Sequence, residues 1–132
     1  MLLAGCSSAL PQVSVRVGAQ SEVLSPTQYC LDGEPRFYPD AERPPVLRVG
    51  SGEQITIEVS EHLAESGWQV QIFDEQLEEQ LGQVPVGNET VFDGIFTSDA
   101  RPAAYFLVIV QDAGPECEGL SGAWPIGFVR DG

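Results

Sequence analysis

The chain has 132 residues, of which 42% are hydrophobic and 20% charged. That is enough apolar material for the core of one domain and too much for a disordered chain. Twenty acidic residues face six basic ones, and a surface of formal charge −14 repels phosphates, so nucleic acid is not an expected partner. All basic residues are arginines, and none lies between Arg48 and Arg101. We interpret this acidic middle as a solubilising surface, with a face for cations or a basic partner as the alternative.

The N-terminal tetrapeptide Leu3-Ala4-Gly5-Cys6 resembles the lipobox of bacterial lipoproteins. In a lipobox, small residues admit the signal peptidase to the bond before an acylated cysteine. The resemblance implies lipidation at Cys6, a lipobox remnant and tether over residues 1–11, and one domain over residues 12–132. A secretory signal needs about 7–15 apolar residues, so we expect the natural start to lie upstream of Met1.

Apolar runs elsewhere are short, and the longest covers residues 103–110. A membrane-spanning helix needs about 20 apolar residues. We therefore expect an extracytoplasmic protein that is anchored to the cell membrane by lipid and does not span it.

The chain has three cysteines, and lipidation of Cys6 would leave Cys30 and Cys117 as a pair. In an oxidising compartment an even remainder predicts a disulfide between them. Two buried free thiols in a cytosolic protein are the alternative. Neither cysteine has the spacing of a metal site.

The first elements in chain order are strands. Residues 13–17 alternate apolar and polar side chains, residues 18–21 supply a turn, and residues 22–24 complete a hairpin. Residues 32–45 hold four prolines, which predicts a long loop. Strands follow at residues 45–49 and 54–60.

A single helical turn is expected over residues 61–65, capped by Ser60 and ended by Gly67. In the strand that follows, Trp68, Val70 and Ile72 share one face and the glutamines the other. Residues 74–81 fit either a short helix or a solvated hairpin connection. The last predicted strands cover residues 90–96, 103–110 and 123–129, the second apolar on both faces and therefore central.

Seven or eight short strands with almost no helix predict an all-β fold, a two-layer β-sandwich. Trp68 on a middle strand and Tyr105 on a late one favour an immunoglobulin-like arrangement. A small β-barrel is the alternative.

Several motifs together resemble one family. They are the lipobox, the Val-x-Val strand, Ser25-Pro26-Thr27-Gln28-Tyr29-Cys30, and Gly67-Trp68-Gln69-Val70. The combination is similar to the small actinobacterial lipoproteins that are catalogued only as a domain of unknown function. The resemblance implies an exported envelope protein and brings no catalytic or ligand residues to this chain.

Catalytic and metal chemistry finds little support in the residues. The single histidine, His62, is expected at the surface, and no serine lies in a nucleophile elbow. Gly50-Ser51-Gly52 lacks the lysine and glycine spacing of a phosphate loop and predicts a turn. We expect no cofactor and no zinc, and the acidic residues do not follow calcium-loop spacing.

Trp124 is the one aromatic residue that we consider a candidate for a binding surface. Pro125 follows Trp124, and a proline often marks an edge strand that leaves its neighbour accessible. The leading hypothesis is a non-catalytic, membrane-anchored envelope module that contacts a protein or polymer. The alternatives are an envelope hydrolase with a carboxylate pair, and a cytosolic β-domain whose lipobox is accidental.

Overall fold

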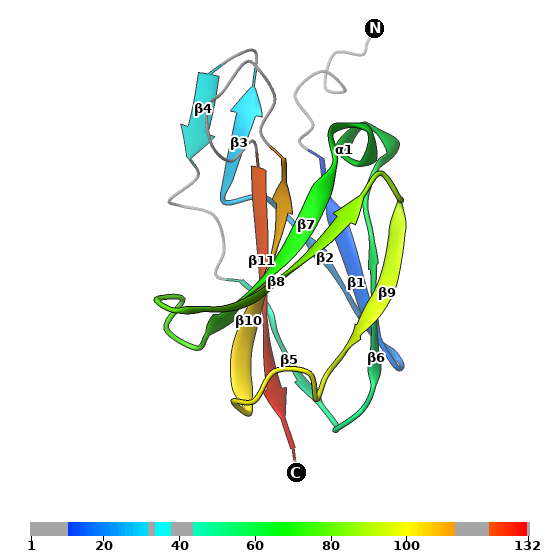
Figure 1. Ribbon diagram of the computed structural model, residues 1–132, viewed down its shortest axis with the longest axis vertical. Coiled ribbons are helices and arrows are strands. Elements are labelled where there is room, and N and C mark those ends of the chain that lie inside the picture. The colour runs from blue at the N-terminus through cyan, green and yellow to red at the C-terminus, as the bar shows by residue number, and fades with distance from the viewer. Residues whose placement is uncertain (1–10, 32–33, 38–43, 113–121, 132) are drawn as a thin grey trace, which may run out of the picture.

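The computed structural model describes residues 11–31, 34–37, 44–112 and 122–131, which form two stacked β-sheets and one short helix (Figure 1). The strands are β1 (Val13–Val17), β2 (Gln20–Leu24), β3 (Gln28–Leu31), β4 (Glu34–Phe37), β5 (Val46–Val49), β6 (Gln54–Glu58), β7 (Trp68–Asp74), β8 (Gln80–Gly87), β9 (Val91–Phe96), β10 (Ala104–Gln111) and β11 (Gly122–Arg130). The helix is α1 (Glu61–Ser66). The predicted all-β sandwich is confirmed, and the barrel alternative is wrong because the two sheets stay separate.

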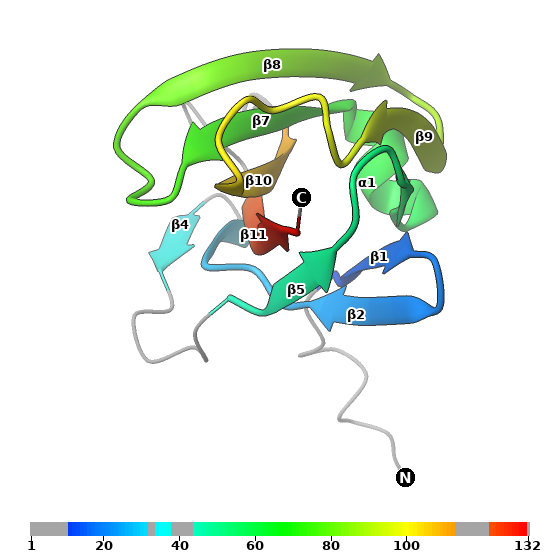
Figure 2. The same cartoon turned by 90° about the horizontal axis from the view of Figure 1, so that it is seen from below.

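Sheet A has the strand order β2-β1-β6-β9, and sheet B has the order β4-β3-β11-β10-β7-β8 with β5 also paired to β11. All described pairs are antiparallel except β5 with β11. The strands β6, β7, β8, β9, β10 and β11 pair as strands B, C, C′, E, F and G do in immunoglobulin domains. The arrangement is therefore immunoglobulin-like, and the view from below shows its two layers (Figure 2).

The core lies between the sheets and follows from period-2 alternation. In β1 the burial pattern alternates strictly, so that Val13, Val15 and Val17 point inward. From sheet B the largest inward side chains are Trp68, Tyr105, Trp124 and Phe128. As predicted, β10 is central, with β11 on one side and β7 on the other. Its inner residues Tyr105, Leu107 and Ile109 are all within 2% of complete burial.

The short helix forms as its sequence predicts. The Ser60 hydroxyl accepts a hydrogen bond from the Leu63 amide at 3.3 Å and so caps the first turn. Gly67 ends the helix with φ of 89°, a region that favours glycine. Because Leu63 and Ala64 are buried, α1 closes one end of the sandwich between β6 and β7.

The strand count was underestimated, since eleven strands occur among the described residues. The long loop predicted over residues 32–45 is wrong in part, because β3 and β4 form a hairpin whose second strand lies inside it. Of the two alternatives for residues 74–81, the solvated hairpin connection is confirmed: residues 75–79 are exposed and turn between the antiparallel strands β7 and β8, although β8 already begins at Gln80. The strands β4 and β8 were missed because their residues do not alternate regularly between apolar and polar.

Candidate functional site

Two of the three cysteines, Cys6 and Cys117, lie outside the described residues. Cys30 is described at the centre of β3 and is disulfide-bonded. The lipidation of Cys6 and the pairing of Cys30 with Cys117 therefore stay predictions. Cys30 belongs to the β3–β4 hairpin, which pairs with β11 only through Tyr29 and Gln28. A covalent tie at Cys30 thus acts on the hairpin that has the shortest pairing to the rest of sheet B.

The expectation of an accessible ring at Trp124 is wrong, because the side chain is fully buried. Its indole Nε1 donates to the carbonyl of Pro11 at 2.9 Å, and its ring meets that of Tyr29 edge to face at 6.1 Å. Trp124 therefore binds the first described residue of the chain to strand β11. It holds the point where the predicted tether joins the domain.

The neighbouring proline misled the prediction because β11 is not an edge strand. The amide of Gly127 donates to the Pro45 carbonyl on the β5 side, whereas the amide of Arg130 donates to Ala103 on the β10 side. Alternation therefore directs position 125 away from β10. On that side β3 pairs only up to Ala123 and β5 begins at Gly127, so Pro125 occupies the gap, where no ladder hydrogen bond is lost.

Opposite the helix end lies the C-terminal end of the sandwich, which comprises the β1–β2 turn, the β5–β6 turn, the β9–β10 connection and Asp131 (Figure 1). Thr97, which is fully buried, joins two of these segments. Its hydroxyl donates to the Gly50 carbonyl at 2.5 Å and accepts from the Glu53 amide at 2.9 Å. Its own amide donates to the Glu53 carbonyl at 2.8 Å.

The carbonyl oxygen of Thr97 also accepts two hydrogen bonds. It accepts from the Tyr105 hydroxyl at 2.8 Å and from Arg130 Nη1 at 3.0 Å. The same guanidinium donates to the carbonyls of Ala100 and Arg101 at 2.8 and 3.1 Å. The Tyr105 bond back to a residue upstream matches the tyrosine corner of immunoglobulin domains. Burial raises the pKa of Tyr105 from 10.0 to about 12, although nearby Arg130 opposes the rise.

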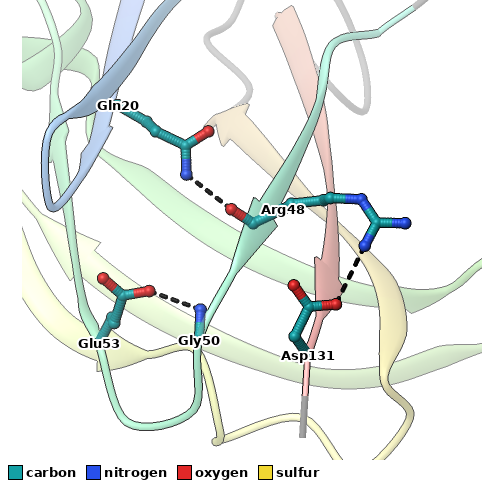
Figure 3. A network of polar contacts seen from close by, with 5 residues as sticks. All are labelled: Gln20, Arg48, Gly50, Glu53 and Asp131. Carbon is teal, nitrogen blue, oxygen red and sulfur yellow. Dashed lines mark hydrogen bonds and ion pairs between the residues drawn. The ribbon is translucent and has the colours of Figure 1, made fainter.

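A second group of polar contacts joins the outer strands at this end (Figure 3). Glu53 Oε2 accepts from the Gly50 amide at 2.6 Å, and Gln20 Nε2 donates to the Arg48 carbonyl at 2.6 Å. Arg48 forms an ion pair with Asp131 at 3.1 Å, but both side chains are more than half exposed, so the pair contributes little to stability. Together the contacts hold the β5–β6 turn beside the β1–β2 hairpin and the end of β11.

The candidates for chemistry do not converge. His62 is exposed on α1, as predicted. Asp74 Oδ1 accepts from the amides of Glu78 and Glu79 at 2.8 and 3.2 Å, so this carboxylate orders the β7–β8 turn. Within the described ranges, no cluster of histidine, cysteine or acidic side chains could hold a metal ion. In the same ranges no helix is long and apolar enough to cross a membrane.

The face predicted for the glutamines of β7 is confirmed. Trp68 and Val70 are buried in the core, whereas Gln69 and Gln71 lie on the outer face of sheet B and are half-buried. Phe73 and Phe106 are paired on that same outer face. Phe106 was not recognised as an outer-face residue, because an apolar side chain on a strand that is apolar on both faces resembles a core residue. Comparison with family models, curated proteins and solved structures found no match to the chain.

Proposed function

We propose that the chain is the folded domain of a lipid-anchored envelope protein and acts there as a non-catalytic binding or accessory module. The observation that carries the proposal is the tetrapeptide Leu3-Ala4-Gly5-Cys6, which stands a few residues before the first strand. The oxidising compartment that it implies agrees with the disulfide-bonded state of Cys30. The proposal places the protein in the family of small actinobacterial lipoproteins that its motifs resemble.

The contact between Trp124 and Pro11 supports an orientation for such an anchored domain. Five residue steps separate Cys6 from Pro11, and an extended chain of that length spans at most about 18 Å. The domain would thus stand close to the membrane on the end that carries α1. The C-terminal end, with its three turns, would point away from it (Figure 1).

The polar network at the C-terminal end supports a binding role more than a catalytic one. Thr97, Tyr105 and Arg130 use their polar groups on backbone carbonyls, so these side chains hold the connections in place. A partner that met this end would find turns already held in one conformation, which lowers the entropy cost of binding. Loops carried on a rigid sandwich are a common recognition surface, an analogy at the level of fold.

The test is the intact mass of the protein from the membrane fraction of its native host, before and after reduction and alkylation. We expect a mature chain that begins at Cys6, carries a diacylglyceryl group, and takes up two alkyl labels only after reduction. The Cys6→Ser variant should leave the membrane fraction. An unmodified chain that retains Met1 and has three alkylatable thiols would contradict the anchor and the compartment together.

The binding role has its own experiment. The Cys6→Ser full chain is immobilised through a C-terminal tag and exposed to solubilised host envelope. The components that it captures are then identified. Recovery of one envelope protein or polymer that a heat-denatured sample of the same chain does not retain is the expected result. Hydrolysis of envelope polymer by the same preparation would instead favour an enzyme with a carboxylate pair.

A further inference from the structure

The β3–β4 hairpin is attached to the sandwich at few places. It stands at the end of sheet B, where β3 pairs with β11 through Gln28 and Tyr29, whereas β10 pairs with β11 at eight positions. The Thr27 amide adds a hydrogen bond to the Ala123 carbonyl at 2.9 Å. Figure 1 shows the hairpin at the margin of the molecule, beside the beginning of β11. A two-stranded hairpin is only marginally stable by itself in water, so its position depends on what holds it against β11.

The hairpin contributes an aromatic ring to the core. Among its side chains that the structure describes, only that of Tyr29 belongs to the core. This ring meets the indole of Trp124 edge to face, with the centroids 6.1 Å apart. A Cβ placed on Gly122 would lie 2.6 Å from the Trp124 ring and 3.0 Å from the Tyr29 ring. Both rings therefore pack against the beginning of β11, and Tyr29 helps to keep Trp124 out of water.

A covalent bond adds to these contacts. Cys30 follows Tyr29 in β3 and is disulfide-bonded. Neither of the other two cysteines lies in the hairpin, so the bond ties the hairpin to another part of the chain. Ordering the backbone of β3 and β4 against β11 costs conformational entropy, which the two paired residues and the buried ring have to offset. The disulfide lowers this cost, because it keeps the hairpin beside the sandwich even when the other contacts break.

We propose that the disulfide at Cys30 is a redox-sensitive switch: its reduction releases the β3–β4 hairpin from β11 and uncovers Trp124, while the rest of the sandwich stays folded. A dithiol reductant gives two electrons and two protons, becomes a disulfide itself, and leaves Cys30 and its partner as thiols. Opening is local because the other core residues come from elements outside the hairpin.

The change would reach beyond the hairpin. The Trp124 indole also donates to the Pro11 carbonyl, so its environment couples the hairpin to the point where the predicted tether joins the domain. The inference does not rest on the lipid anchor, because the hairpin and its disulfide belong to the folded domain. A chain without lipid therefore tests the switch separately from the proposed function.

The experiment is amide hydrogen exchange, followed by mass spectrometry, of the Cys6→Ser full chain before and after reduction with excess dithiothreitol. Exchange in β3 and β4 should become at least about thirtyfold faster after reduction, since a disulfide typically stabilises the state that it closes by that factor or more. Exchange in β7 and β10 should stay within about twofold, because those strands keep their core. Removal of the reductant and reoxidation should restore the slow exchange of the hairpin.

Tryptophan fluorescence gives an independent measurement of the same opening. Trp68 and Trp124 are both fully buried, so acrylamide should quench the oxidised chain little. After reduction the emission of Trp124 should become accessible to acrylamide, whereas that of Trp68 should not. In a Trp124→Phe variant, reduction should therefore leave the quenching unchanged.

The matched control is Cys30→Ser, which cannot form the disulfide. Its hairpin should exchange rapidly both with and without dithiothreitol, which excludes an effect of the reductant on any other part of the chain. A thermal melt establishes that the sandwich is still folded. Unchanged exchange in β3 and β4 after reduction would overturn the proposal. So would equally faster exchange in β7 and β10, since the disulfide would then stabilise the whole fold and not the hairpin alone.

Discussion

The hydroxyl of Thr97 makes two hydrogen bonds at the C-terminal end of the sandwich. Replacing Thr97 by the isosteric valine would leave the Gly50 carbonyl and the Glu53 amide without their partner. Because Thr97 is fully buried, Thr97→Val is expected to lower the free energy of unfolding by about 2–4 kcal/mol. Urea unfolding measures this. Thr97→Ser keeps the hydroxyl and should cost clearly less, and equal losses for the two variants would assign the effect to packing.

The raised pKa of Tyr105 predicts that the stability of the fold depends on pH at high pH. The pKa is raised by burial to about 12 in the folded protein, against 10.0 in the unfolded chain. A raised pKa means that the folded state keeps the proton longer, so the contribution to stability is complete below pH 10 and is lost as pH rises toward 12. Relative to Tyr105→Phe, the unmodified protein should lose about 1.5 kcal/mol between pH 10 and 11.5.

The Tyr105 measurement compares the two proteins by urea unfolding at each pH, so that other ionising groups cancel. Below pH 10 the unmodified protein should be the more stable by about 1 kcal/mol, since only it has the hydrogen bond to the Thr97 carbonyl. Parallel pH profiles for the two proteins would show that the ring is accessible to water in the folded state.

At the residue scale, the sequence correctly predicted features that depend only on neighbouring residues. Ser60 and Gly67 cap α1 as predicted, because capping depends on neighbouring backbone groups. It failed at Trp124, whose burial depends on Pro11 and Tyr29, far away in the chain. It also could not assign Phe106 to the surface, since that requires knowing which face of β10 meets sheet A.

Pro125 shows how an element depends on its neighbours on both sides. Its nitrogen points into the gap between β3 and β5, so Pro125→Val should change the free energy of unfolding by less than about 1 kcal/mol. Position 126 points the other way, toward Leu107 of β10, and Ile126→Pro should cost about 3 kcal/mol or more. Thermal melts of both variants distinguish these cases, and similar losses would place β11 in a different register.

The same dependence explains which strands the sequence could predict. In β1 and β6 every second residue is apolar and buried, so the pattern alone is sufficient. In β8 most side chains are exposed or half-buried, because it is the outermost strand of sheet B, and the pattern is correspondingly weak. β4 contains Pro35, which a local rule places in a loop, whereas a short outer strand tolerates it.

At the scale of the whole molecule, the two ends of the sandwich differ. At the helix end Trp124 binds Pro11, and at the C-terminal end buried hydrogen bonds hold the turns. If the domain is anchored as proposed, these turns point away from the membrane and are available to a partner (Figure 1).

The net charge of −14 leads to the last prediction, which concerns cations. Among the described residues the carboxylates are dispersed and no metal cluster forms, so cations should act by screening alone. Millimolar calcium should then raise the melting temperature no more than magnesium at equal ionic strength, and by only a few degrees. The measurement is a thermal melt of the Cys6→Ser full chain in each salt. A rise specific to calcium would show that acidic side chains outside those ranges complete a site, because a bound ion stabilises the folded state in proportion to its occupancy.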